Sequence, residues 1–157
     1  MDADWIMTRL NPAVTFVLRS RLHYPLSLGL MLLTVTGRRS GQRYTIPVGY
    51  QRRGECLLVL VSKAHRKRWW RNYLAPGPVE VRMRGRTLGG EARCVPPGSE
   101  EFREALDSTF RRYPRLGRQF GISYSRHIGL TPEQQARVSD EAAVVEITLA
   151  PSRRVGA

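Results

Sequence analysis

A turn of two arginines and a serine between glycines is the most chemically specific stretch of the chain. It reads Gly-Arg-Arg-Ser-Gly at residues 37–41, after the apolar run 30–33 and before the strand-like segment 43–48. An apolar strand, a glycine-containing turn and a second strand are typical of a hairpin. Glycines let the backbone approach a ligand closely, and guanidinium groups bind phosphate or carboxylate oxygens through paired hydrogen bonds. The turn is therefore predicted to bind an anion.

A second basic segment, residues 62–72, follows the apolar run 57–61 and reads Ser-Lys-Ala-His-Arg-Lys-Arg-Trp-Trp-Arg-Asn. Its cations, together with a helix N-terminus at this point, suit a phosphate or carboxylate chain. Trp69 and Trp70 can stack on a flat ring. The alternatives stay open: one of the two tryptophans packs in the core, and the cations form a solvated face or a nucleic-acid patch.

Other chemistries find little support in the sequence. His23, His65 and His127 have no ligand-like spacing, and no pair of carboxylates is placed for acid–base work. There is no nucleophile elbow, Walker motif or dinucleotide fingerprint. Cys56 and Cys94 lie in strand-like stretches and are expected to be small buried residues in a reducing compartment. If the chain is an enzyme, an organic cofactor is expected to carry its chemistry, and no metal is expected.

The charge balance points to an anionic partner. The 157 residues contain 26 Lys and Arg against 13 Asp and Glu, which gives a net charge of +13. Nucleic acid, an anionic membrane surface and a polyanionic small molecule all suit such a charge. The start of the chain is acidic rather than typical of a secretory signal, and the uncharged run 24–37 is too short to span a bilayer. A cytoplasmic protein is predicted, with peripheral membrane contact as an alternative.

The pattern of elements predicts one α+β domain over residues 1–157, an antiparallel barrel or curled sheet with helices outside. Six strands are expected, at residues 30–36, 43–52, 55–61, 79–83, 86–95 and 142–149. Short helices are expected at 65–74, after Ser99, and after Thr131-Pro132. A basic amphipathic helix at 12–22 is expected to cover the core, or else to lie on an anionic membrane. Residues 151–157 read as a frayed tail.

Three motifs occur in an order that resembles the deazaflavin-dependent nitroreductase and quinone reductase family. They are T-G-R-x-S-G-x-x-x-x-x-P at residues 36–47, Trp69-Trp70-Arg71-Asn72, and the strand after residue 79. The resemblance covers roughly residues 25–95. It implies a six-stranded, mostly antiparallel split β-barrel with flanking helices, as in these actinobacterial oxidoreductases. It also implies reduced coenzyme F420 as the hydride donor, with FMN as the alternative cofactor because related split barrels use it.

The resemblance also implies roles for individual residues. The phosphate and polyglutamate tail of the cofactor would be held by Arg38, Arg39, Ser40, Gly41 and Arg43, while Thr45, Pro47 and Val48 would line the deazaflavin. Ser62 and Lys63 would face the polar edge of the ring, and Lys67, Trp69 and Asn72 would complete the wall. Tyr113 and Tyr124 are candidate proton donors, and Trp70, Phe120 and His127 are candidate substrate contacts.

One segment departs from the pattern of that family. The nitroreductases usually carry a Gly-Gly turn and a proline before a Trp-Tyr pair, whereas this chain has Lys-Ala-His-Arg-Lys-Arg before Trp69-Trp70. In this respect it is closer to an offshoot of the family linked to fatty acids or lipids.

The first hypothesis is an F420-dependent reductase that transfers hydride to a quinone, a nitroaromatic compound or an unsaturated lipid-like acceptor. The alternative is a non-catalytic split barrel that binds a fatty acid, another lipid or a cofactor. A nucleic-acid binder ranks third. A homodimer is compatible with the architecture, although the sequence does not show one.

Overall fold

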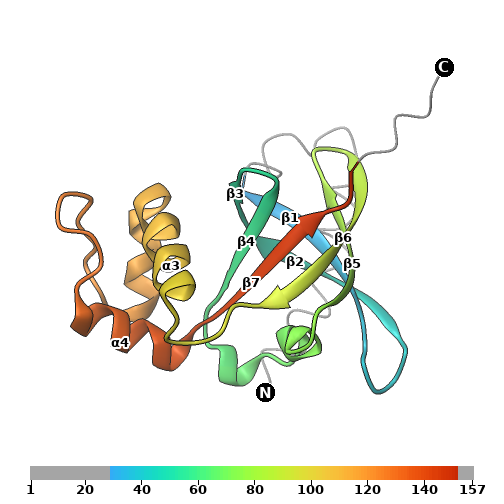
Figure 1. The fold of residues 1–157 in the computed structure, drawn as a ribbon, viewed down its shortest axis with the longest axis horizontal. Coiled ribbons are helices and arrows are strands. Elements are labelled where there is room, and N and C mark those ends of the chain that lie inside the picture. The colour runs from blue at the N-terminus through green and yellow to red at the C-terminus, as the bar shows by residue number, and fades with distance from the viewer. Residues whose placement is uncertain (1–28, 152–157) are drawn as a thin grey trace.

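Seven strands form one antiparallel sheet in the part of the chain that the computed structural model describes, residues 29–151 (Figure 1). The strands are β1 (Leu30–Thr36), β2 (Arg43–Gly49), β3 (Gln51–Arg53), β4 (Cys56–Val61), β5 (Gly77–Met83), β6 (Arg86–Cys94) and β7 (Ala143–Leu149). Their order across the sheet is β2-β1-β5-β6-β7-β4-β3. The α+β class and the antiparallel barrel are confirmed.

The two edges of this sheet are consecutive in the chain, and this closes the barrel. β2 and β3 lie at opposite edges, yet only Tyr50 separates them. The sheet must therefore curl until its edges meet. Tyr50 donates its backbone N–H to the carbonyl of Gly29 at 3.0 Å and buries its ring, leaving 8% exposed. The single strand predicted at residues 43–52 is thus two strands, which is why seven strands are found where six were expected.

Alternating residues of the strands fill the inside of the barrel. This inner core contains Met31, Leu33, Val35, Leu57, Val59, Val61, Val79, Val81, Ala92, Val145 and Ile147. β4 is buried on both faces, as the apolar run predicted, because Leu58 points the other way into a second core under the helices.

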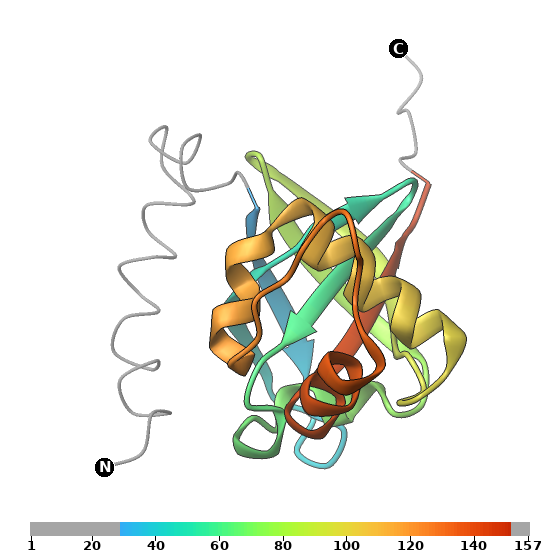
Figure 2. The same cartoon turned by 90° about the vertical axis from the view of Figure 1, so that its left-hand side faces the viewer.

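The second core lies between the sheet and a layer of helices. The layer contains α3 (Glu100–Arg112), η3 (Pro114–Phe120, a 3-10 helix) and α4 (Pro132–Glu141), which cover one side of the barrel in Figure 2. Phe102, Leu106 and Phe110 are the apolar face of α3 and are fully buried. Both predicted helix starts are confirmed, because the Ser99 side chain caps α3 and Thr131 forms a capping box at α4.

Two short 3-10 helices close one end of the barrel. They are η1 (Ala64–Arg66) and η2 (Trp69–Tyr73), in place of the single helix predicted at 65–74. The chain is extended at Lys67, between them. The break lets Trp69 and Tyr73 enter the inner core, with 8% and 2% of their surface exposed, while Trp70 is half-buried. The prediction that only one of the adjacent tryptophans is buried is confirmed.

The helix predicted at residues 12–22 and most of the predicted tail, residues 152–157, lie outside the described residues. Within residues 29–151, no helix is long and apolar enough to cross a membrane.

Neighbouring glycines of β6 give a matched test of the packing between β6 and β7. A Cβ on Gly90 would lie 2.6 Å from the backbone oxygen of Thr148, whereas one on Gly89 would meet nothing within 4 Å. We expect Gly90→Ala to lower the free energy of unfolding by about 1–3 kcal/mol, because backbone must move to admit the methyl group. Gly89→Ala should change it by less than about 0.5 kcal/mol. Urea denaturation measures both, and equal effects would contradict the register of β6 on β7.

Candidate functional site

The turn between β1 and β2 is a compact loop built on its two glycines. The N–H of Gly37 donates to the carbonyl of Gln42, and the N–H of Gly41 donates to the carbonyl of Gly37, each at 2.8 Å. Gly41 has a left-handed φ of 68°. A Cβ on Gly37 would lie 2.5 Å from the Ser40 hydroxyl oxygen, so only glycine fits there without a shift. The geometry of the turn that is predicted to bind an anion therefore explains why glycine stands at both positions.

Asn72 ties this turn to the Trp-containing segment. Its Oδ1 accepts the backbone N–H of Arg38 at 2.9 Å, and its Nδ2 donates to the carbonyl of Trp69 at 2.9 Å and to the Tyr44 hydroxyl at 3.3 Å. One side chain therefore joins the turn, β2 and η2. The two segments that the sequence predicted as halves of one site lie side by side.

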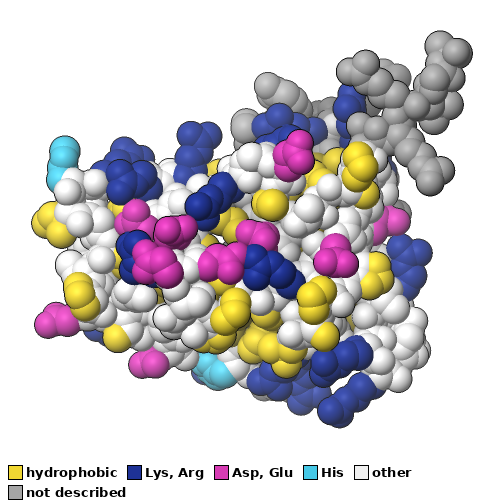
Figure 3. Space-filling view, viewed as in Figure 1, with side chains coloured by type: hydrophobic (Ala, Val, Ile, Leu, Met, Phe, Trp, Pro, Cys, Tyr) yellow, Lys and Arg dark blue, Asp and Glu magenta, His cyan; other side chains and the backbone are white. Residues whose placement is uncertain are grey.

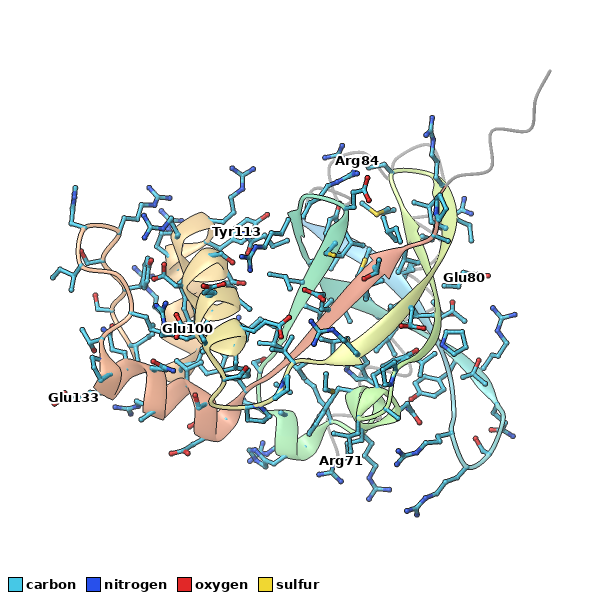
Figure 4. The ribbon with its side chains drawn as sticks, in the orientation of Figure 1. Arg71, Glu80, Arg84, Glu100, Tyr113 and Glu133 are labelled. Atoms are coloured by element: carbon cyan, nitrogen blue, oxygen red, sulfur yellow. The ribbon has the colours of Figure 1, made fainter. Side chains whose placement is uncertain are left out.

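The arginines of this site differ in their partners. Arg43 forms an ion pair with Glu80 of β5 at 3.3 Å (Figure 4 labels Glu80). Arg38 and Arg39 are exposed and form no ion pair with another described residue. Because no carboxylate of residues 29–151 neutralises their guanidinium groups, Arg38 and Arg39 are better placed than Arg43 to bind an external anion.

Strand β2 presents its two faces differently to the site. Thr45 and Pro47 lie on its outer face, where the hydroxyls of Thr34 and Thr45 are 2.9 Å apart. Val48 lies on the inner face and packs against the inner core. The three residues predicted to line a ring together are therefore divided between the two faces.

Lys67 is a half-buried cation among the residues 62–72 that are predicted to line the cofactor ring. Its ammonium group donates to the Ser62 hydroxyl at 3.4 Å. Burial lowers the pKa of Lys67, and the neighbouring charge of Lys63 lowers the pKa further. Lys63 itself adopts a left-handed φ of 49°. Such a conformation costs a residue with a Cβ about 1 kcal/mol or more.

Trp70 is held by backbone contacts at this end of the barrel. Its indole N–H donates to the carbonyl of Ala64 at 2.8 Å, and its own carbonyl accepts the Cys94 thiol at 3.2 Å. Burial raises the pKa of Cys94 to about 11, so this thiol stays protonated and unreactive at neutral pH. The Arg71 guanidinium lies 5.6 Å from the centre of the Trp70 ring.

Tyr44 belongs to this site, although the sequence analysis did not select it. Its ring is 39% exposed at the mouth of the barrel, and its hydroxyl accepts the hydrogen bond from Asn72. Burial raises the pKa of Tyr44, and the hydrogen bond from Asn72 acts in the opposite direction. The alternation Tyr44, Ile46, Val48 was the available signal, because it places Tyr44 on the inner face at the open end of β2.

The predicted proton donors and substrate contacts other than Trp70 lie in the helical layer, away from the turn. Tyr124 donates to Asp107 at 2.8 Å, and Phe120 is 3% exposed with its ring edge-on to Phe110. His127 is exposed on the loop before α4. Tyr113 follows α3 and has an exposed ring (Figure 4). The loop of His127 and the β1–β2 turn occupy opposite ends of the molecule in Figure 1. The structure does not bring these four residues to the turn.

An open hollow of about 400 Å³ lies elsewhere, between α3 and β3. Gln51, Asp107 and Arg111 are among its lining residues, so carboxylates and guanidiniums share it. This mixed charge suits a polyanion less well than the turn does.

Solved structures share this architecture at low sequence identity. One described as an F420-H2 dependent reductase (FDR-A) is 18% identical, with 76% of this chain and 94% of that chain covered and a TM-score of 0.54. HutZ, described as the heme storage protein of Vibrio cholerae, is 13% identical, with 91% and 92% covered and a TM-score of 0.55. A third, described as a domain-swapped dimer, is 19% identical, with 85% and 98% covered and a TM-score of 0.52. No curated protein matches the sequence.

At 13–19% identity these structures show the fold alone, which is the split β-barrel. The family follows from the sequence itself. A family model described as F420H(2)-dependent quinone reductase matches residues 11–124, well over half of the chain. The chain therefore belongs to this family and is an F420-dependent oxidoreductase, as the resemblance implied.

The role of Asn72 as the tie between the turn and η2 can be tested by amide exchange. In Asn72→Ala the Arg38 N–H loses its acceptor, so we expect its exchange to accelerate at least tenfold and stability to fall by about 1 kcal/mol. Ser40→Ala is the matched control, since the Ser40 hydroxyl accepts from Gln42 within the turn. Unchanged Arg38 exchange in Asn72→Ala would show that the tie does not hold the turn.

Proposed function

We propose that the chain binds reduced coenzyme F420 between the β1–β2 turn and residues 62–72, and reduces a quinone there. The observation that carries this proposal is the pair Arg38 and Arg39, without described carboxylate partners, on a turn that Asn72 holds against the Trp-containing segment. A cofactor with a phosphate and a glutamyl tail supplies the negative charge that can pair with these guanidiniums. The description of the family supports both the cofactor and the quinone.

The residues at the turn fit the anionic part of this cofactor. A Cβ added at Gly41 would meet nothing within 4 Å, so the backbone at Gly41 is open for close approach by a ligand. In our proposal Arg38, Arg39, Ser40 and Gly41 bind the phosphate and the tail. Arg43, which is paired with Glu80, contributes less.

The wall of the site would hold the ring and keep water away from it. When bound, the reduced deazaflavin supplies a hydride to the acceptor. Trp69 is buried and fixes the shape of the barrel mouth, and Asn72 fixes the position of the turn. We assign Ser62, Lys63 and Lys67 to the polar edge of the ring. Thr45, Pro47 and Val48 remain proposed contacts of the ring, although they come from both faces of β2.

The acceptor would lie against Trp70, the half-buried aromatic ring at this end. A flat quinone stacks on such a ring, and nitroaromatic or unsaturated lipid-like molecules are further proposed acceptors. Of the two tyrosines proposed as proton donors, Tyr124 already donates to Asp107, whereas the Tyr113 ring is exposed. Because both tyrosines lie away from the β1–β2 turn, solvent is the proton source in our proposal, and the assignment of Tyr113 stays a sequence prediction. Phe120 is buried, and His127 lies on a loop at the opposite end of the molecule from the turn, so neither contacts the acceptor in this arrangement.

A non-catalytic carrier of a fatty acid, lipid or cofactor is the second candidate. The left-handed Lys63, in place of a Gly-Gly turn, favours it because the ring wall differs from that of the nitroreductases. FMN is the alternative cofactor of the first candidate. Native mass spectrometry of protein purified from its host separates these candidates. We expect bound F420, whereas a bound acyl chain alone would favour the carrier and bound FMN alone would favour the alternative cofactor.

We also propose a homodimer. The support is architectural, since a solved structure with the same fold is described as a domain-swapped dimer.

The arginines of the turn give a direct test of cofactor binding. Hydrogen bonds to charged groups contribute about 1.5–3 kcal/mol each, so Arg38→Ala/Arg39→Ala should weaken F420 binding by tenfold or more. Arg84→Ala/Arg86→Ala, at the β5–β6 turn, removes the same charge and should change affinity less than about threefold. Fluorescence anisotropy of F420 measures both. Equal weakening by the two pairs would mean that net charge, not the turn, binds the cofactor.

The lowered pKa of Lys67 predicts a pH dependence of cofactor affinity. A lysine is charged below its pKa, so Lys67 loses its charge at a lower pH than an ordinary lysine as the solution becomes alkaline. Affinity for the anionic cofactor should then fall as pH rises. Lys67→Arg should remove this part of the fall, because arginine stays charged. Identical pH profiles for the two proteins would exclude contact between Lys67 and the cofactor. Comparing them cancels the titration of F420 itself.

A further inference from the structure

Three exposed residues form a row along the 3-10 helix η2. A 3-10 helix has three residues per turn, so Arg68, Arg71 and Leu74 lie on one side of it. All three are exposed, and Leu74 leaves 60% of its surface open to solvent. The other two rows face inward, with Trp69 and Tyr73 buried. At about 2 Å per residue the row is about 12 Å long. We call it the η2 row.

The surroundings of the η2 row are cationic. Between Glu55 and Glu80 the chain has five Lys and Arg and no Asp or Glu. Asn72 also fixes the arginine-containing β1–β2 turn beside η2. Figure 3 shows Lys and Arg gathered at this lower end of the molecule, and Figure 4 shows Arg71 pointing outward there. A single exposed leucine is ordinary on a protein surface, but one in line with arginines, in a stretch of sequence that contains no Asp or Glu, is the pattern of an interfacial lipid contact.

We propose that the η2 row docks the protein on an anionic lipid bilayer. The guanidiniums of Arg68 and Arg71 bind lipid phosphates, and the side chain of Leu74 enters the boundary between headgroups and acyl chains. Arginine suits this position, because its guanidinium pairs with phosphate and its stem can lie along apolar surface. The exposed Ala75 and Pro76, which follow Leu74, extend the apolar end of the row.

A bilayer fits the η2 row better than a nucleic acid does. Proteins that bind single strands offer exposed aromatic rings for base stacking. The row itself offers an aliphatic side chain instead, and Trp70 of η2 is half-buried with the Arg71 guanidinium near it. Leu74 would have no function on a phosphate backbone.

Docking through the η2 row does not depend on the cofactor assignment. Its consequence for the reaction does: if the proposed function is correct, docking would bring the reactive end of the barrel to the layer in which lipophilic quinones dissolve.

Vesicle binding tests the proposal without cofactor or substrate. We expect the full chain to sediment with vesicles of phosphatidylcholine containing about 30% phosphatidylglycerol, and not with pure phosphatidylcholine. Arg68→Glu/Arg71→Glu should weaken this binding tenfold or more. The control Arg84→Glu/Arg86→Glu makes the same change of charge at the opposite end of the molecule, where Figure 4 labels Arg84, and should weaken it less than threefold.

Leu74→Ser separates lipid insertion from charge alone. Salt screens the attraction between charges but not the insertion of an apolar side chain. The parent protein should therefore keep part of its vesicle binding at about 0.5 M salt, and Leu74→Ser should lose that part. Binding that survives both Leu74→Ser and Arg68→Glu/Arg71→Glu would overturn the proposal and direct attention to residues 12–22. Equal affinity for RNA, unaffected by Leu74→Ser, would overturn it in favour of a nucleic-acid surface. Thermal unfolding of each variant confirms that it is folded.

Discussion

The carboxamide of Asn72 connects the β1–β2 turn directly to β2 and to η2. It accepts one backbone N–H from the β1–β2 turn and donates to the carbonyl of Trp69 and to the hydroxyl of Tyr44. Without it, the turn would be a hairpin loop projecting from the barrel. With it, the turn that carries Arg38 and Arg39 is held to the Trp-containing segment, and in our proposal the two form opposite sides of the cofactor site. The position of the cofactor in our account follows from this contact.

The division of charge around this contact explains how one basic surface can serve two purposes. Arg43 of β2 forms an exposed ion pair with Glu80 of β5, across β1, so its charge already has a carboxylate partner. Arg38 and Arg39 lie on the turn, where no described carboxylate reaches them. Arg68 and Arg71 lie on the outside of η2, in line with Leu74. In our account these arginines therefore serve three partners, namely a carboxylate of the barrel, the cofactor and a lipid surface, and the positive charge does not serve one polyanion alone.

The sequence predicted those structural features that depend on residues close together in the chain. The alternation in the strands, the burial of β4 on both faces and the caps at Ser99 and Thr131 are all local, and all were predicted. The break at Tyr50 was not, because the alternation continues through it and only barrel closure requires the turn. The contact between Arg38 and Asn72 joins residues 34 positions apart, and no local pattern indicates such a bond. The helical layer around Phe120 and Tyr124 was assigned to substrate by resemblance, whereas packing uses it as a second core.

Mapping of the bound cofactor by NMR tests the central claim most directly. Adding F420 to ¹⁵N-labelled protein should shift the backbone amides of residues 37–42 and 62–72, which flank Asn72. Amides around the hollow between α3 and β3, such as Gln51 and Arg111, should stay unchanged. Shifts confined to that hollow, with the β1–β2 turn unaffected, would contradict the account and place the cofactor on the other side of the barrel.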